Sequence, residues 1–239
     1  MAGSVGNIET GIIKNGLVFN MDAANRASYI NGNTKAFNTT NLSQSGSLIN
    51  DVSFNSENQG VFIFDGVDDY VDCGNMYRSQ LSNATALTIH FWAYSTSSSN
   101  RILLDFKEGT SRIVIQRYSN SKLYLYVNGI NAEYTNSTSL NTWYHITYVF
   151  NGSESSNSNK LKLYVNGVEI AGASFSGTVS TSIGAFTSAM ESKIGALYNL
   201  FNPSTYNWQG DIGPIHFYNR ALSSTEVLHN YNALKGRFE

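Results

Sequence analysis

Short runs in which apolar residues alternate with polar ones recur along the chain, and this pattern predicts β-strands. The runs are rich in β-branched and aromatic residues, and clusters of Gly, Asn and Ser separate them. They cover residues 17–21, 61–65, 69–73, 86–94, 101–106, 112–118, 122–127, 143–150 and 160–165. A chain with many strands and little helix favours two stacked antiparallel sheets. The predicted fold class is therefore all-β, an antiparallel sandwich of the jelly-roll kind.

Two Asn-Gly pairs mark tight turns within this pattern. Asn128-Gly129 and Asn166-Gly167 both suit a two-residue hairpin of type I′, because Asn and Gly tolerate positive φ at the two central positions. Residues 151–160 are poor in apolar side chains and are expected to form an exposed hairpin tip. Residues 178–192 have no clear period and are interpreted as a long loop with a short strand.

Only the C-terminal segment has the period of a helix. Ser223 and Glu226 form a capping box, and Gly236 is placed to end the helix. The residues expected on its apolar face are Val227, Leu228, Tyr231 and Leu234. We expect this helix to pack on the edge of the sandwich or to close the chain.

Nothing in the sequence divides these elements into separate domains. No linker rich in Pro or Gly interrupts the chain, so we predict one domain over residues 16–239, preceded by an N-terminal arm over residues 1–15. The arm is expected to dock on its own domain or on a neighbouring subunit. No apolar run approaches the ~18 residues of a membrane span, and the first residues lack the pattern of a signal peptide. We therefore expect a soluble protein without a secretion signal.

Composition excludes several classes of partner and stabilising bond. The 239 residues carry 15 Lys and Arg against 17 Asp and Glu, a net charge of -2, without a basic cluster. Binding to nucleic acid or to an anionic membrane surface is therefore not expected. Cys73 is the only cysteine, so no disulfide can form within the chain, and we expect its thiol to be a small buried apolar group.

Three segments are distinctive because of their order and spacing along the chain, and together they resemble the pattern of a known family. They are FDGVDDYVDCG (64–74), ALTIHFWAY (86–94) with NTWYHITYVFNG (141–152) and KLYVNG (162–167), and WQGDIGPIHFYNRALSSTEV (208–227). Together they resemble the laminin-G-like jelly-roll domains of the concanavalin A-like lectin/glucanase superfamily. Members commonly carry Asp-Glu where this chain has Gly213-Pro214, so the role of those acidic residues does not transfer. Trp92 and Trp143 lie on predicted strands and are expected to pack in the core.

Within that family, the closing stretch HFYNRALSSTEVLHNYNALKGRF (216–238) resembles copies in virion structural proteins of tailed phages, marine ones in particular. The resemblance implies a virion surface protein, assembled in the host cytoplasm as a capsid decoration or a tail adhesion module. Its implied partners are other virion proteins, further copies of the chain and cell-surface glycans. A free carbohydrate-binding lectin, with or without calcium, is the alternative.

Calcium is the metal that the sequence favours, because its ligands are hard oxygens of the kind found in acidic turns. The candidate ligands are Asp65, Asp68, Asp69 and Asp211, with Asp22 in reserve. The alternative is that these carboxylates only accept hydrogen bonds from turn amides. Zinc is less favoured, because the four histidines are dispersed and there is one cysteine.

Residues 197–210, LYNLFNPSTYNWQG, are interpreted as a loop that combines aromatic rings with amides. A ring that stacks on a sugar face beside amides that bind hydroxyls is an arrangement suited to neutral glycans. The candidate carbohydrate-binding residues are Tyr198, Asn199, Phe201, Tyr206, Asn207 and Trp208. The alternative is that the aromatic residues cover the end of the sandwich or an intersubunit contact.

Catalysis is not expected. Glycoside hydrolysis needs two carboxylates that flank the scissile bond. The related glucanases place Glu, Asp and Glu at alternate positions on one strand, and neither Glu-x-Asp-x-Glu nor Glu-x-Asp-x-x-Glu occurs in this sequence. We therefore predict a protein that binds without turnover.

Overall fold

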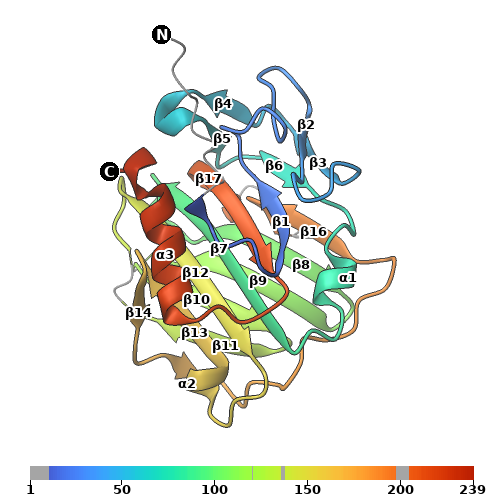
Figure 1. Cartoon of the computed structure of the whole chain (residues 1–239), viewed down its shortest axis with the longest axis vertical. Helices are drawn as coiled ribbons and strands as arrows, with labels where there is room; N and C mark the ends of the chain where they lie inside the picture. The colour runs from blue at the N-terminus through green and yellow to red at the C-terminus, as the bar shows by residue number, and fades with distance from the viewer. Residues whose placement is uncertain (1–10, 120, 136–137, 198–204) are drawn as a thin grey trace.

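The computed structural model describes residues 11–119, 121–135, 138–197 and 205–239. Within these ranges the chain forms two antiparallel sheets that pack face to face (Figure 1). The predicted all-β sandwich is therefore confirmed. None of the helices in these ranges has the length and apolar character needed to cross a membrane.

Sheet A contains the two longest strands side by side. β7 (Ala86–Ser95) pairs with β12 (Trp143–Asn151) on one side and with β17 (Gln209–Tyr218) on the other. β1 (Leu17–Met21) also pairs with β17. The full order is β14 (Val168–Ile170), β13 (Leu161–Val165), β12, β7, β17, β5 (Val61–Asp65) and β4 (Ser53–Asn55).

Sheet B lies opposite and contains a meander of four strands that are consecutive in the chain and pair in order. Its order is β15 (Ser174–Phe175), β11 (Ile130–Tyr134), β10 (Leu123–Val127), β9 (Ser111–Arg117), β8 (Arg101–Glu108), β16 (Glu191–Ile194), β6 (Tyr70–Asp72), β3 (Ser45–Ile49) and β2 (Lys35–Phe37). Asn128 and Gly129, between β10 and β11, both have positive φ, as the type I′ prediction requires. Asn166 and Gly167, between β13 and β14, have the same conformation.

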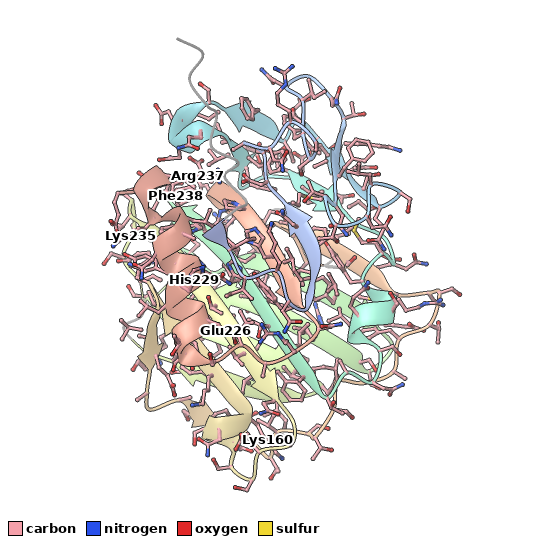
Figure 2. The ribbon with its side chains drawn as sticks, in the orientation of Figure 1. Lys160, Glu226, His229, Lys235, Arg237 and Phe238 are labelled. Carbon is pink, nitrogen blue, oxygen red and sulfur yellow. The ribbon has the colours of Figure 1, made fainter. Side chains whose placement is uncertain are left out.

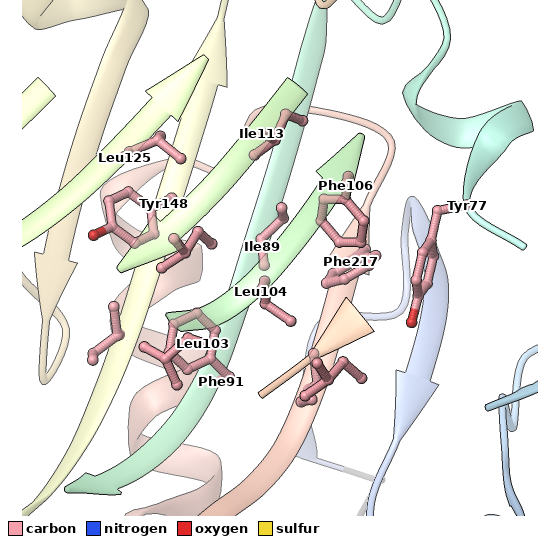
Figure 3. Packing of buried hydrophobic residues seen from close by; sticks show 14 of the residues in the cluster. Tyr77, Ile89, Phe91, Leu103, Leu104, Phe106, Ile113, Leu125, Tyr148 and Phe217 are labelled. Atoms are coloured by element: carbon pink, nitrogen blue, oxygen red, sulfur yellow. The ribbon is translucent and has the colours of Figure 1, made fainter. Parts of the chain in front are cut away.

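The hydrophobic core lies between the two inner faces (Figure 3). Phe106 from sheet B meets Phe217 from sheet A edge to face, with ring centroids 5.6 Å apart. Tyr77 packs on both rings, and its hydroxyl lies 3.4 Å from the Sγ of Cys73. Burial raises the pKa of the Cys73 thiol to about 12, so it is a packing group as expected.

Within the described ranges, three α-helices connect or cover the sheets, α1 (Arg78–Leu81), α2 (Asn157–Lys160) and α3 (Ser224–Leu234), and a 3-10 turn (Glu57–Gln59) follows β4. α3 is the predicted C-terminal helix, and its capping box between Ser223 and Glu226 is present. Leu228 was expected on the apolar face, but it is 43% exposed, and Asn230 is buried in the contact with sheet A instead. A one-turn 3-10 helix, Lys235–Arg237, follows α3, so the helical path does not stop before Gly236.

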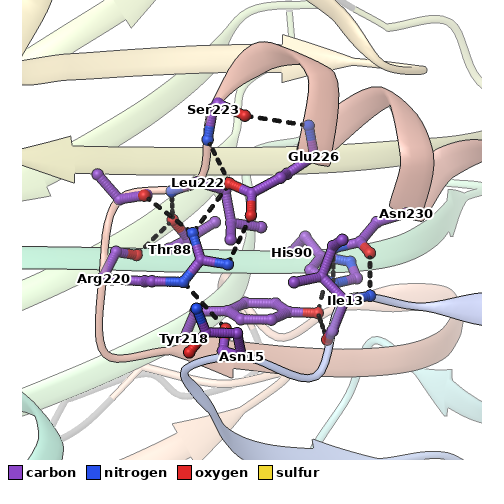
Figure 4. Close-up of polar contacts among 11 residues, drawn as sticks. Ile13, Asn15, Thr88, His90, Tyr218, Arg220, Leu222, Ser223, Glu226 and Asn230 are labelled. Atoms are coloured by element: carbon purple, nitrogen blue, oxygen red, sulfur yellow. Dashed lines mark hydrogen bonds and ion pairs between the residues drawn. The ribbon is translucent and has the colours of Figure 1, made fainter.

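α3 covers the outer face of sheet A, and two ion pairs hold it there. At its start Arg220 pairs with Glu226, and the Nε of Arg220 also donates to the carbonyl of Asn15 at 2.9 Å (Figure 4). At its end Arg237 forms a bidentate pair with Asp22, at 2.7 and 3.1 Å, with both side chains only 4% exposed. Figure 2 shows Arg237 and Phe238 at the upper end of this helical segment.

The described part of the N-terminal arm docks on the same layer. The backbone N–H of Ile13 donates to the Oδ1 of Asn230 at 2.8 Å, and the Tyr218 hydroxyl donates to the carbonyl of Ile13 at 2.9 Å (Figure 4). Ile12 is buried among Trp92, Leu234 and Phe238. Trp92 is thus a core residue as expected, although it packs beneath α3 and not between the sheets.

Three histidines are buried on the face of sheet A that α3 covers. His90, His145 and His216 come from β7, β12 and β17 and are at most 2% exposed. The Nε2 of His145 lies 2.9 Å from the Nδ1 of His90, and the rings of His90 and His216 stack at 4.4 Å. Burial lowers the pKa of His145 to about 3 and lowers the pKa values of the other two well below the ordinary range.

This cluster makes folding sensitive to acid. A histidine that is neutral when folded and protonated when unfolded contributes stability that is present above pH ~6.5 and is lost as the pH falls. We predict that His145→Gln, which removes one such proton, flattens the pH dependence of unfolding free energy by about 1.4 kcal/mol per pH unit below pH ~6. Denaturant unfolding of both proteins from pH 7 to 5 measures the difference. Parallel profiles would contradict the prediction.

Candidate functional site

Among the described residues, no helix packs on the outer face of sheet B, whereas α3 covers that of sheet A. Strand alternation sends Leu123, Leu125 and Val127 of β10 into the core and turns Tyr124 and Tyr126 outward. On β9, Ile113 and Ile115 are likewise core residues and Gln116 faces out, as does Tyr118 directly after the strand. The four outward side chains are half-buried, which leaves them accessible to a ligand.

These outward residues line a pocket of about 360 Å³, which we call the tyrosine pocket. Its walls come from β8 to β11 and from the segment before β17: Ile102, Arg112, Val114, Gln116, Tyr118, Tyr126, Asn131, Leu197 and Tyr206. Tyr124 stands behind Tyr118, with the two rings stacked at 3.9 Å. The pocket thus combines three phenol rings with two amides on rigid strands.

Tyr206 reaches the pocket because its segment is bound to β8. The backbone N–H of Ile102 donates to the carbonyl of Tyr206 at 2.8 Å. Arg101 extends the attachment by donating to the carbonyl of Thr205 at 3.3 Å and to the side chain of Gln209 at 3.1 Å. A residue distant in sequence is therefore fixed beside Tyr118.

The charges around the tyrosine pocket are paired. Arg112 donates two 2.9 Å hydrogen bonds to the carboxylate of Asp105, which is fully buried. Near Tyr124, the carboxylate of Glu133 accepts hydrogen bonds from the Tyr124 hydroxyl and from Lys122. Burial, with smaller effects of Tyr206 and Glu133, raises the pKa of Tyr118, so this phenol stays neutral. The pocket therefore presents an almost neutral surface.

Of the predicted carbohydrate-binding residues, Tyr206 lies in this pocket. Trp208 does not: its ring is 1% exposed and belongs to the core, so it is not available to a sugar and the expectation for it is corrected. Asn207 is equally buried. Its Nδ2 donates to the carbonyl of Val67 at 3.1 Å, so the side chain connects the segment before β17 to the turn between β5 and β6. Tyr198, Asn199 and Phe201 lie outside the described residues.

Sequence reasoning missed most of the pocket. Gln116, Tyr118, Tyr124 and Tyr126 all lie in segments that it placed in strands, and Asn131 lies just after the predicted turn at Asn128-Gly129, in a segment that it left unassigned. The signal was present, because LYLYV has tyrosines at the alternate positions that face away from the core. Which neighbouring strands these tyrosines would meet required the sheet order.

Two larger hollows elsewhere are less suited to a specific ligand. One, of about 690 Å³, lies beside β3, β6 and α1 and is lined mainly by serines with Asp72 and Arg78, without an aromatic side chain among the described residues. The other, of about 750 Å³, lies near β2 to β4; its Tyr29 is 5% exposed and packs against Phe54. Neither offers open ring faces as the tyrosine pocket does.

Three of the four predicted metal ligands come together at the turn between β5 and β6. The carboxylates of Asp65, Asp68 and Asp69 each have an oxygen within 4.8 Å of the others. Asp65 and Asp68 are exposed, and Asp69 is 4% exposed. Burial, opposed by a hydrogen bond from the Asp65 amide, raises the pKa of Asp69 to about 6, and the neighbouring carboxylates add to the rise.

Asp211 is not part of this cluster. It lies on β17 opposite Ile63 and Tyr94, and burial followed by the charge of Glu57 raises its pKa to about 6. Asp22, the reserve candidate, is held by Arg237. The candidate metal site is therefore reduced to the three carboxylates of one turn.

The chemistry of this turn fits calcium, and it also fits the structural alternative. Hard carboxylate oxygens in a flexible loop are the ligands that calcium prefers. Two of the oxygens already accept hydrogen bonds, from Asp65 N–H to Asp69 at 3.0 Å and from Val67 N–H to Asp65 at 2.7 Å. Since Asn207 ties Val67 to the segment that carries Tyr206, the turn and the tyrosine pocket are physically connected.

Comparison with models of protein families shows which family the chain belongs to. The family model described as the concanavalin A-like lectin/glucanases superfamily matches residues 65–228. This range includes the tyrosine pocket and the acidic turn. The chain belongs to this superfamily. Among curated proteins, no match was found.

Solved structures share the fold of this superfamily member at low sequence identity. A Trypanosoma rangeli sialidase is 15% identical with a TM-score of 0.66, and the match covers 95% of this chain and 34% of the sialidase. The receptor binding domain of botulinum neurotoxin type G is 13% identical with a TM-score of 0.61, over 92% of this chain and 51% of that domain. The chain thus spans a third to a half of these proteins, and the likeness shows the fold alone.

The acidic turn of this superfamily member gives a direct test for calcium. A carboxyl group whose pKa is raised on folding contributes stability at low pH that is lost as the pH rises from about 4 to 6. In chelator at pH 7, Asp69→Asn should therefore stabilise the protein by on the order of 1 kcal/mol. Millimolar calcium should raise the melting temperature of the wild type by a few degrees and leave Asp69→Asn unchanged.

Asp211→Asn is the matched control. Its carboxyl group has a similarly raised pKa but lies outside the cluster, so the variant should keep the calcium response. Differential scanning calorimetry with calcium and with chelator measures all three proteins. If calcium does not change the melting temperature of the wild type, the three carboxylates do not bind calcium and only accept hydrogen bonds within the turn.

Proposed function

We propose that this chain is a carbohydrate-binding module that takes a neutral saccharide in the tyrosine pocket and does not cleave it. The observation that carries the proposal is a set of half-buried tyrosines beside two amides, the half-buried Gln116 and the exposed Asn131, on the outer face of sheet B that the described helices leave uncovered. The volume of about 360 Å³ lies within the range of small-molecule sites.

The tyrosine rings supply the apolar half of saccharide recognition. Tyr118, Tyr126 and Tyr206 each present a phenol that combines an apolar face with a polar hydroxyl. A pyranose ring is built in the same way, with C–H groups on its faces and hydroxyls at its edge. The stack of Tyr118 on Tyr124 fixes one ring before any ligand arrives, which lowers the entropy lost on binding.

The amides supply the polar half. Gln116 and Asn131 each offer a donor and an acceptor, and a sugar hydroxyl can both donate and accept. Hydrogen bonds of this kind discriminate among hydroxyl configurations, because a buried polar group left without a partner costs more than the bond contributes. The same residues thus provide specificity where the rings provide contact area.

The charge pattern supports an uncharged ligand. The one charged residue that lines the described part of the pocket is Arg112, and its guanidinium is already bound through two hydrogen bonds to the buried Asp105. An acidic sugar would have to compete with this carboxylate for the same cation. A neutral hexose or an oligosaccharide of neutral hexoses meets no such competition.

The pocket lining also supports binding without hydrolysis. Hydrolysis needs two carboxyl groups on either side of the glycosidic bond. The residues that line the described pocket include no Asp or Glu, and the nearby Asp105 and Glu133 are engaged by Arg112, Lys122 and Tyr124. The sialidases that share the fold therefore do not argue for turnover here, at 15% identity.

The phage resemblance of residues 216–238 supports placing this module on a virion surface, with copies of the chain and other virion proteins as partners. Mass spectrometry of purified particles tests that placement, and light scattering tests self-association. A free lectin would be absent from particles but would bind the same sugars. Saccharide binding and virion location are thus tested separately.

Substitution of the tyrosines tests the binding proposal. On an array of neutral and acidic glycans, the wild type should bind neutral ones selectively. Tyr118→Ala and Tyr206→Ala should each weaken binding of the best ligand by about tenfold or more, because each removes one ring face. Isothermal titration calorimetry with that ligand gives the affinities.

The control is Tyr94→Ala, which removes a half-buried tyrosine from the outer face of sheet A and should leave affinity unchanged. Melting temperatures of all variants separate lost binding from lost folding. Trp208 is unsuitable for this test, because truncating a buried Trp costs about 3–5 kcal/mol of stability by itself. Equal binding by the wild type and both pocket variants would refute the proposal.

A further inference from the structure

The tyrosine pocket has an aliphatic bottom as well as aromatic walls. Ile102 and Val114 line it and are only 1% and 6% exposed, whereas its tyrosines are half-buried. The half-buried Leu197 adds a third aliphatic side chain. A sugar hydroxyl placed against these residues would lose its hydrogen bonds to water without gaining a partner. This part of the pocket therefore favours an apolar group of the ligand.

Arg112 brings to the same pocket a donor group that no described residue uses. Its Nε and Nη2 donate to Asp105, and this bidentate pair turns one edge of the planar guanidinium toward the buried carboxylate. The other amino group, Nη1, points away from Asp105 and has no acceptor among the described residues. The side chain is 23% exposed, so a ligand can reach it. Since arginine can only donate, its partner on the ligand must be an acceptor.

Three outward positions of β9 place these groups in a row. Arg112, Val114 and Gln116 alternate with the core residues Ile113 and Ile115, so they stand on one face of the strand. The row presents a charged donor, an apolar side chain and an amide whose oxygen can accept. An acetamido substituent on a sugar has the matching groups. Its carbonyl oxygen and its N–H lie on opposite sides, and its methyl group forms the end.

From this row we infer that the tyrosine pocket selects a saccharide that carries an acetamido group, an N-acetylhexosamine. The methyl group would contact Ile102 and Val114, the carbonyl oxygen would accept from the Nη1 of Arg112, and the N–H would donate to the Oε1 of Gln116. The pyranose ring would lie against the tyrosines, and Asn131 would remain for its hydroxyls. This selectivity rests on the proposed function, because it names the class of sugar for the same pocket.

Other sugars suit the pocket less well. A hexose without the acetamido group has only hydroxyls to place at the aliphatic bottom. A sugar whose carboxylate met the Nη1 of Arg112 would bring a second negative charge close to Asp105, and like charges at short range repel each other. The oxygen of an acetamido group carries no net charge and avoids this repulsion. The volume of about 360 Å³ lies at the lower end of the range for small-molecule sites, which suits one sugar residue with its substituent.

Two matched pairs of ligands test the selectivity by isothermal titration calorimetry on the full chain. N,N′-diacetylchitobiose and cellobiose share one backbone of linked glucose units and differ only where acetamido groups replace hydroxyls. The methyl glycosides of N-acetylgalactosamine and galactose form the second pair, with the other ring configuration. In at least one pair the acetamido member should bind about tenfold or more tightly, because it adds a buried methyl group and a hydrogen bond to a charged donor.

Variants of the row locate the preference. Val114→Thr replaces one methyl group by a hydroxyl of similar size and should reduce the acetamido preference by about threefold or more. The same substitution at Val168, an exposed valine of sheet A, should leave the preference unchanged. Arg112→Met should reduce it further, but this variant leaves Asp105 without its partner and can fail to fold. Val114→Thr is therefore the deciding variant, with its melting temperature as the check on folding.

The possible results distinguish the acetamido selectivity from saccharide binding itself. If none of the four ligands binds and the glycan array is also negative, the proposed function fails and the selectivity fails with it. If the members of both pairs bind equally well, or the plain hexoses bind more tightly, saccharide binding stands and the acetamido selectivity is overturned. A preference that folded Val114→Thr retains in full would also overturn it.

Discussion

The structure depends on how the outer face of sheet A is covered. That face carries Trp92, Trp143 and three histidines. Without a cover, these rings would form a flat aromatic surface in contact with solvent, which is unfavourable. α3 and the 3-10 turn after it cover this face, and the buried Arg237–Asp22 pair fixes their far end to the residue that follows β1. Phe238 completes the cover by stacking on Trp92 at 4.3 Å.

Because α3 covers the outer face of sheet A, we looked for a ligand-binding surface on the outer face of sheet B. A single short helix is available at the end of the chain, and it is committed to sheet A. The strands of sheet B carry tyrosines, amides and paired charges on the outer face, which the described helices leave uncovered. Because these residues stand on paired strands and not on free loops, their geometry is set before any ligand binds.

The fold was largely predictable from local pattern, and the exceptions have physical reasons. Every predicted strand exists, since alternation and the two Asn-Gly turns are local signals. β17, the most connected strand of sheet A, was missed because Gly210, Gly213 and Pro214 interrupt its pattern. Gly210 is required there: its φ is +126°, and a Cβ would lie 2.1 Å from the carbonyl oxygen of Tyr94. Pro214 falls where the pairing of β17 with β7 shifts register.

The candidate sites were less predictable, because they join segments distant in the chain. The acidic turn is local, so Asp65, Asp68 and Asp69 were correctly grouped, whereas Asp211 was not. Treating residues 197–210 as one surface loop placed Trp208 and Asn207 at the surface, although the start of β17 draws both into the interior. Tyr118 and Tyr126 became recognisable as site residues only when β9, β10 and Tyr206 were seen together.

We propose that ligands bind on the outer face of sheet B. Backbone amide chemical shifts of the isotopically labelled chain, titrated with the best neutral oligosaccharide, test it most directly. We expect the largest shifts on β9, β10 and the residues around Tyr206, with α3 and the turn at residues 65–69 little affected. Shifts concentrated on α3, or in the serine-lined hollow near Asp72 and Arg78, would contradict it.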